Sequence, residues 1–174
     1  MTGTGGQGAG AAVDWLVSAA PDPDDWRRRW EGDPRGLALF PTGRRWDVLV
    51  LPGGIAGPTL DVLTRLTDRP GPVLADFGAT LRGRAPGPRL GFFVPPGTSE
   101  RWVGTGTHAV GPGAWVVLPY PGRTAGGVRW LVLPDGSGTL TDPVLLELSM
   151  HEAAAVVAGT DGEWDAGGGG RQRS

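Results

Sequence analysis

The acidic side chains are the first residues whose chemistry can be tested against the sequence. Asp47 stands at the start of an apolar run, Asp61 lies early in an expected helix, and Asp76 ends another apolar run. Two-metal catalysis needs carboxylates that converge within a few ångströms. Because Asp47 and Asp76 are expected near different ends of neighbouring strands, their spacing does not favour a two-metal site. Asp61 is favoured by the positive end of its helix.

The two histidines lack the partners that catalysis would need. His108 would have to act with a nearby serine, and Ser99, in a polar turn without a nucleophile-elbow motif, is the only candidate. His151 stands beside Glu152, but the second histidine of an H-E-x-x-H zinc motif is missing. We therefore expect His108 on a surface loop and His151 on the surface of a helix.

Arginines are the candidates for binding a phosphate. They precede two apolar strands and flank the last hairpin: Arg44, Arg45, Arg89, Arg123 and Arg129. If the fold gathers them on one face, their guanidinium groups would bind the phosphates of a nucleotide or nucleic acid. The alternative is a set of separately solvated surface charges, and the sequence leaves both open.

Composition excludes several kinds of site. The 174 residues include no Cys and no Lys, so all 16 basic residues are Arg. The absence of Cys excludes disulfides, thiolate zinc sites and Cys nucleophiles, and the absence of Lys excludes Schiff-base chemistry and a P-loop. A net charge of −2 gives no overall basic field. Without a long apolar stretch or a signal peptide, the chain is expected to be cytoplasmic, with no membrane contact.

The chain contains eight Trp residues, and we expect them to pack in the core. Four of them are expected between the first helices and the sheet: Trp15, Trp26, Trp30 and Trp46. Others recur near the later strands: Trp102, Trp115 and Trp130. Trp buries a large area, which suits the core of a small domain. Stacking on nucleic-acid bases is the alternative.

Helix and strand signals predict the elements that position these residues. Helices are expected at 11–20, Asp22–Gly32, Pro58–Leu66 and from Thr141 or Asp142 to Gly159, with Asp22 as a cap and Pro23 at a first helical position. The turn Gly53-Gly54-x-x-Gly57 before Pro58 is expected to be a plain tight turn, and the alternative is a phosphate site at the N-terminus of the following helix. Strands are expected at Leu37–Phe40, Trp46–Leu51, Pro72–Phe77, Leu90–Val94, Ala114–Pro119 and Val128–Leu133.

The order of these elements predicts an α+β fold in which helices cover one face of a mixed β-sheet. We expect one domain over residues 11–159, with flexible tails at 1–10 and 160–174 whose composition cannot support ordering. The segment Gly78–Pro88 is expected to be an exposed hairpin loop.

An ordered series of short motifs carries a family resemblance over about Trp26 to Ala155. The series is "GLALFPTGRRWDVLVLPGG", "GPVLADFG", "RLGFFVPPGT" and "GPGAWVVLPYPGRTAGGVRWLVLPDG". It resembles the bifunctional DNA primase/polymerase N-terminal (Prim-Pol) domain, especially the short single-domain actinobacterial type. The resemblance implies a Prim-Pol-like, archaeo-eukaryotic primase-like architecture and a descent from nucleotidyltransferases.

The residues that serve catalysis in that family are missing here. Its metal-binding acid pair corresponds to Leu51-Pro52-Gly53, and its nucleotide-gripping histidine corresponds to Leu90. Phosphoryl transfer depends on metal ions that neutralise developing charge. The resemblance therefore implies a degenerate active site that binds at most nucleotide or DNA, with no cofactor unless residual activity uses Mg²⁺ or Mn²⁺. The alternative is a non-catalytic structural or regulatory interaction protein.

Overall fold

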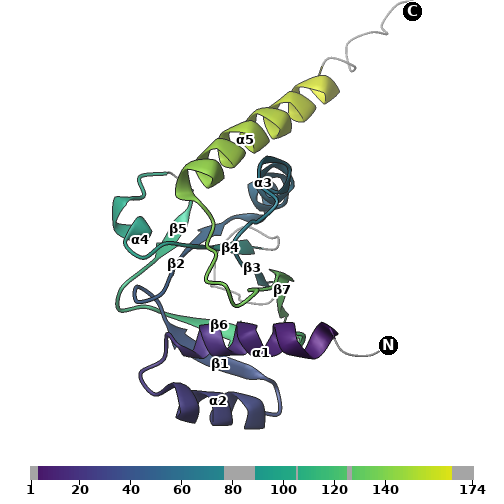
Figure 1. Cartoon of the computed structure of the whole chain (residues 1–174). Helices are drawn as coiled ribbons and strands as arrows, with labels where there is room; N and C mark the ends of the chain where they lie inside the picture. The colour runs from purple at the N-terminus through teal and green to yellow at the C-terminus, as the bar shows by residue number, and fades with distance from the viewer. Residues whose placement is uncertain (1–3, 77–88, 105, 125–126, 166–174) are drawn as a thin grey trace, which may run out of the picture.

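The computed structural model of the chain describes residues 4–76, 89–104, 106–124 and 127–165. These residues form helices and two β-sheets, which confirms the expected α+β class (Figure 1). The helices are α1 (Thr4–Val17), α2 (Pro23–Gly32), α3 (Gly53–Leu66), α4 (Thr98–Arg101) and α5 (Pro143–Asp165). The strands are β1 (Leu37–Pro41), β2 (Asp47–Leu51), β3 (Val73–Asp76), β4 (Arg89–Val94), β5 (His108–Val110), β6 (Trp115–Pro119) and β7 (Val128–Val132).

The larger sheet has the strand order β5-β2-β4-β3-β7, and every neighbouring pair in it is antiparallel. The expected mixed sheet is therefore wrong. β2 and β3, which α3 connects, run in the same direction, but β4 lies between them and pairs with both. A strand–helix–strand pattern predicts two strands of one direction, and it does not reveal that a later strand separates them.

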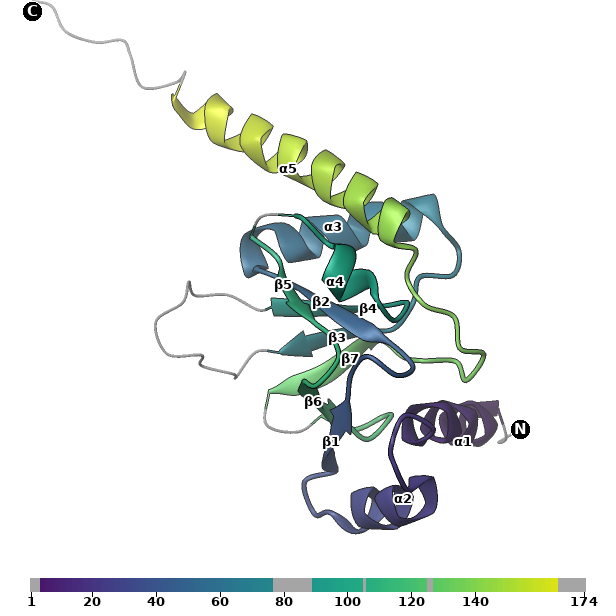
Figure 2. The ribbon, with the colours of Figure 1, turned by 90° about the vertical axis from the view of Figure 1, so that its left-hand side faces the viewer.

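The second sheet is a two-stranded ribbon of β1 and β6. It lies on one side of the larger sheet together with α1, and α2 packs beside its β1 strand, whereas α3 and α5 cover the opposite side (Figures 1 and 2). The indole N–H of Trp130, on β7, donates to the Pro119 carbonyl oxygen of β6 over 2.9 Å and thereby links the two sheets.

Two clusters of buried side chains hold these layers together. The tryptophan cluster, on the α1 side, includes Val13, Leu16, Trp30, Phe40, Trp46, Val48, Phe93 and Leu118. Trp15, Trp26 and Trp130 pack against it, which confirms the expected packing of the early tryptophans. The α3/α5 cluster, on the other face, includes Leu49, Leu51, Leu63, Phe92 and Leu146. Burying each such side chain contributes about 1.5–3 kcal/mol.

The segment that leads into helix α5 passes very close to the backbone of Gly71. A Cβ built on Gly71 would lie 2.2 Å from the Thr141 nitrogen and 2.6 Å from the Leu140 carbonyl carbon. The Thr141 N–H donates to the Phe93 carbonyl oxygen over 2.8 Å, so this segment is tied to β4 just before α5 begins. Asp142 then caps α5 by accepting the Val144 N–H over 2.8 Å.

Three helix boundaries differ from those expected. α1 begins at Thr4, so the expected tail is wrong over residues 4–10, and α5 continues past Gly159 to Asp165. α3 begins at Gly53, so the expected tight turn is helical and Pro58 lies inside the helix. Glycine lowers helix propensity by only about 1 kcal/mol per residue, and hydrogen bonding and packing can outweigh that. The expected loop at Gly78–Pro88 lies outside the described residues.

Among the described helices, none combines the length and the apolar character that a membrane span needs.

Candidate interaction surface

The candidate arginines do not lie on one face of the molecule. Arg44 and Arg45 are exposed at the tip of the tight β1–β2 turn, where the Gly43 N–H donates to the Trp46 carbonyl oxygen over 2.8 Å. β2 starts directly after this turn and is paired there with the last residue of β4. Arg89 is the first residue of β4, so the length of the strand separates it from the turn.

Arg129 and Arg123 lie apart from Arg44 and Arg45 and from Arg89. Arg129 is paired with Ala75 of β3, which faces the α3/α5 cluster. Arg89 is paired with the next residue of β3, so strand alternation places Arg89 and Arg129 on opposite faces of the sheet. The Arg123 guanidinium lies 5.2 Å from the centroid of the Tyr120 ring. The five arginines therefore do not form one phosphate-binding face, and binding by any of them singly stays a prediction.

The acids are also separated. Asp47 is paired with the last residue of β4 and Asp76 with the first, so they lie at opposite ends of the sheet. Asp47 is fully buried, and its Oδ2 accepts the Ser99 N–H of α4 over 2.9 Å. Among the residues that the structure describes, no three potential metal-ligating side chains are grouped together. The role that the geometry gives Asp47 is to hold α4 against β2.

His108 is an exposed residue in β5 and does not lie in a loop as expected, because pairing with β2 gives this short segment its hydrogen bonds. It is opposite Val50, which faces the tryptophan cluster, whereas Asp47 points to the other face of the sheet. The sheet therefore separates His108 from Asp47 and Ser99, which excludes a Ser/His/Asp arrangement. His151 is exposed on α5, as expected, with its Nε2 4.0 Å from the Glu147 carboxylate.

The two positions that the sequence resemblance matches to an acid pair and a histidine are neighbours in the sheet. Leu51 ends β2 and is paired with Leu90 of β4. Leu51 is fully buried, Leu90 is 4% exposed, and both belong to the α3/α5 cluster. Apolar packing therefore occupies this corner, and the carboxylates and imidazole of a metal-dependent nucleotidyltransferase have no counterparts there.

Large exposed apolar side chains gather on the outer face of the β1–β6 ribbon. Leu39 of β1 is paired with Val117 of β6, and these side chains are 52% and 40% exposed. Trp115 is 50% exposed and is paired with Pro41. Alternation places the inner residues of both strands against the core and these residues outward. Large apolar side chains that gather on a surface mark interaction sites more reliably than single ones do.

Trp26 of α2 completes this surface. Its indole N–H donates to the Leu39 carbonyl oxygen over 2.8 Å, and its ring stacks on that of Trp115 with centroids 6.3 Å apart and planes 23° apart. Leu39, Val117, Trp115 and Trp26 are together called the ribbon patch. The sequence predicted the core contact of Trp26 but not its place on an exposed surface, and it gave Trp115 no role apart from core packing. The alternation in "LALFP" and "WVVLP" is the signal that could have shown the outward residues.

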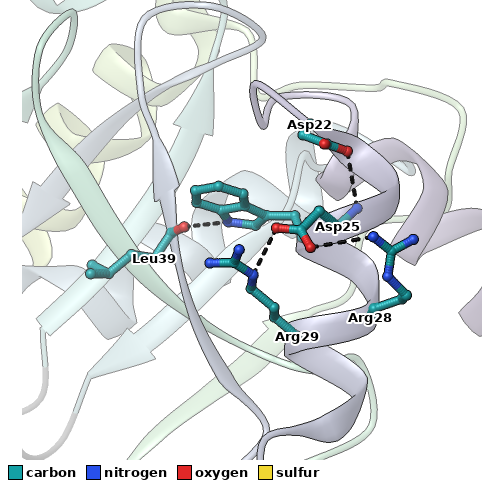
Figure 3. A network of polar contacts seen from close by, with 6 residues as sticks. Asp22, Asp25, Arg28, Arg29 and Leu39 are labelled. Carbon is teal, nitrogen blue, oxygen red and sulfur yellow. Dashed lines mark hydrogen bonds and ion pairs between the residues drawn. The ribbon is translucent and has the colours of Figure 1, made fainter.

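The start of α2 follows the expected cap. Asp22 accepts the Asp25 N–H over 3.0 Å, and Pro23 is the first helical residue. Asp25 then pairs with two arginines: Arg29 Nε lies 2.7 Å from its Oδ2, and Arg28 Nη2 lies 3.3 Å from its Oδ1 (Figure 3). One carboxylate therefore contacts two guanidinium groups beside the ribbon patch, and both arginine side chains stay largely exposed.

A groove of about 220 Å³ lies between α2 and the edge of β1. Its lining residues come from one face of the last two turns of α2, with the C-cap Asp33, and from three consecutive strand residues: Trp26, Arg29, Trp30, Asp33, Leu37, Ala38 and Leu39. The spacing of the helical residues places them on one face. The groove is continuous with the ribbon patch because Trp26 and Leu39 belong to both.

A second hollow, of about 200 Å³, lies beside β7, and Asp135 is among its lining residues. Hydrogen bonds from the hydroxyl of Ser137 (2.5 Å) and from its backbone N–H (2.8 Å) hold the pKa of the Asp135 carboxyl below its ordinary value. These are local turn contacts. The role of Asp135 there is to close the turn ahead of α5.

Replacing Ser137 with alanine should raise the pKa of Asp135 toward its ordinary value, because the hydroxyl is the main cause of the lowering. The remaining backbone N–H should keep part of the effect. A folded-state pKa below the unfolded value stabilises the fold above the unfolded pKa, and this contribution disappears as the pH falls through the folded pKa. The Ser137→Ala variant should therefore lose less stability on acidification. Carboxyl ¹³C titration by NMR checks the shift, and an unchanged pKa would contradict the assigned cause.

Comparison of the chain with protein-family models, curated proteins and solved structures finds no match in any of the three.

Proposed function

We propose that the chain is a non-catalytic binding domain that contacts a partner protein through the ribbon patch. The observation that carries this proposal is the gathering of Leu39, Val117, Trp115 and Trp26 on one outward face. Binding energy in protein interfaces is concentrated in a few aromatic and arginine residues at a water-excluding centre. The ribbon patch has that composition, with Arg29 at its edge.

A protein partner fits this surface better than a nucleic acid. Base binding needs free aromatic faces along a positively charged groove. Here Trp26 and Trp115 stack on each other, and aliphatic Leu39 and Val117 fill the space beside them. The arginines that would follow a phosphate backbone are dispersed over the sheet.

The sequence resemblance adds a proposal about origin. We propose descent from a Prim-Pol-type nucleotidyltransferase, with a cytoplasmic location and with nucleotide or DNA binding as a secondary activity at most. The buried Leu51–Leu90 pair supports loss of the chemistry, because apolar side chains now pack where the family has its polar site.

We expect no primer synthesis or extension with Mg²⁺ or Mn²⁺. Metal-dependent product that disappears on chelation would contradict this.

The interaction proposal is tested by placing a charge in the ribbon patch. Val117→Arg should weaken partner binding by about 2–4 kcal/mol, or roughly 30- to 1,000-fold, because a buried unpaired charge at an interface centre is costly. Val144→Arg is the matched control, since Val144 is 64% exposed on α5, away from the patch. Partners captured by the wild-type chain are identified by mass spectrometry, and their affinities for both variants are then measured by calorimetry.

Light scattering decides whether the partner is a second copy of the chain. A wild-type dimer that Val117→Arg converts to a monomer would identify the ribbon patch as a self-association surface. Both variants should keep the wild-type circular dichroism and melting temperature, because both positions are exposed. Binding that survives Val117→Arg but is lost with Val144→Arg would overturn the proposal and point to α5.

A further inference from the structure

The outer edge of β1 is the feature that goes beyond a simple apolar contact. In the ribbon, the Tyr120 N–H donates to the Gly36 carbonyl oxygen over 2.7 Å and the Thr42 N–H donates to the Ala114 carbonyl oxygen over 3.0 Å. Antiparallel pairs alternate between hydrogen-bonded and non-hydrogen-bonded positions. Residues 38 and 40 therefore bond to β6, whereas the peptide groups of residues 37 and 39 point away from β6, toward α2.

Two residues, Trp26 of α2 and Asp33 at its C-terminal end, bond to two of the four outward N–H and C=O groups of residues 37 and 39. The Leu37 N–H donates to Asp33 Oδ1 over 3.3 Å, and the Leu39 carbonyl oxygen accepts from the Trp26 indole over 2.8 Å. Figure 3 shows the Leu39 carbonyl turned toward α2. Among the described residues, no hydrogen bond engages the two groups that remain, the Leu37 carbonyl oxygen and the Leu39 N–H. Both belong to residues that line the groove.

This pattern of occupied and open groups selects one direction for an added strand. An antiparallel strand needs the N–H and the C=O of the same residue. The N–H of Leu37 is already bonded to Asp33 and the C=O of Leu39 to Trp26, so neither residue has both groups open. A parallel strand needs the C=O of one residue and the N–H of the second residue after it. The Leu37 carbonyl and the Leu39 N–H are such a pair, and they flank Ala38.

The charge and shape of the groove define what such a strand carries. The residue opposite Ala38 would point its side chain inward, beside Trp30, where an apolar group fits. The adjacent residues would point the other way, toward the rim. Arg29 is 75% exposed there, and Asp25 neutralises only one of the two arginines that it contacts. Asp33, the other charged lining residue, has its Oδ1 engaged by the backbone N–H groups of Arg35 and Leu37. A carboxylate on the bound strand would therefore pair with the exposed Arg29 guanidinium.

We propose that β1 binds an extended peptide segment of a partner protein as a parallel strand, with an apolar residue opposite Ala38 and an adjacent carboxylate paired with Arg29. The proposal rests on the proposed interaction function and specifies its binding mode. It also excludes two-fold pairing of β1 with a second copy of itself, because that pairing would be antiparallel.

The test uses two pools of acetylated, amidated heptapeptides with random flanks, one with a central Glu-Val-Glu and one with a central Gln-Val-Gln. NMR spectra of the ¹⁵N-labelled chain should show a shifted, exchange-protected Leu39 amide with the first pool. The tightest binder is then remade with an ester in place of the valine amide, which removes the N–H that would donate to Leu37. One lost hydrogen bond should weaken binding about tenfold.

Two variants test whether the charge of Arg29 sets the preference for Glu over Gln. Arg29→Gln should abolish the preference for Glu over Gln, and Arg28→Gln, which alters the same ion-pair network outside the groove, should retain it. Equal binding of ester and amide, an unmoved Leu39 amide, or no binder in either pool would overturn the parallel-strand proposal. Partner binding that still depends on Val117 in those cases would leave the proposed function standing. A Leu39 shift without any effect of Val117→Arg would support the strand and contradict the ribbon patch.

Discussion

Replacing Trp30 with alanine should lower the free energy of unfolding by about 3–5 kcal/mol. The side chain is fully buried in the tryptophan cluster. Its ring makes edge-to-face contacts with Phe40 and Tyr120, with centroids 4.8 and 5.1 Å away. Its indole N–H also donates to the Gly36 carbonyl oxygen over 3.1 Å. The alanine variant loses all these contacts and leaves a cavity between α2 and the ribbon, which urea unfolding followed by circular dichroism will measure.

Trp26→Ala is the control for this prediction because it removes the same side chain one helical turn earlier. Trp26 is half-buried and makes one hydrogen bond, so the expected loss of stability is about 1 kcal/mol. The same change should weaken partner binding, because Trp26 belongs to the ribbon patch. Equal losses of stability in the two variants would contradict the separation between a core tryptophan and a surface tryptophan.

Replacing Gly71 with alanine should destabilise the fold by at least about 1–3 kcal/mol, the usual cost of overpacking. The added Cβ would meet backbone atoms of Leu140 and Thr141 at 2.6 and 2.2 Å, and backbone cannot turn aside as a flexible side chain can. We expect the Thr141–Phe93 hydrogen bond to break and α5 to lose its attachment to α3. Thermal unfolding gives the total effect, and hydrogen exchange locates it.

Gly54→Ala is the matched control for Gly71. Gly54 lies in α3, and a Cβ there has no neighbour within 4 Å. Alanine should therefore stabilise α3 by about 0.5–1 kcal/mol through its better helix propensity. A Gly71→Ala variant as stable as the wild type would show that the segment ahead of α5 can move away from β3 without loss.

Local signals in the sequence predicted the elements well. The cap at Asp22 and Pro23 specified the start of α2, and six apolar runs marked six of the strands. Such signals act over a few residues, so one sequence is enough to read them. The starts of α1 and α3 were missed because their glycines suggested a tail and a turn, whereas the hydrogen bonds of the helix and its packing decide the outcome.

Features that depend on pairing distant segments could not be predicted. The sequence contains nothing that places β4 between β2 and β3, or that separates β1 and β6 from the larger sheet. The position of each arginine follows from that pairing, so the sequence could not decide between a common face and separate surface charges. The ribbon patch has the same origin: Leu39 and Val117 become one surface only because β1 and β6 pair.

The pairing of β1 with β6 also sets the order in which the molecule can form. Trp26, Trp30 and Leu39 are synthesised early, but their partners Tyr120, Trp115 and Val117 come much later in the chain. Contacts between distant segments slow folding, because the chain loses entropy on closing the long loop before the contacts stabilise it. The side chains of α2 and β1 that contact β6 therefore lack those partners during synthesis until β6 has left the ribosome.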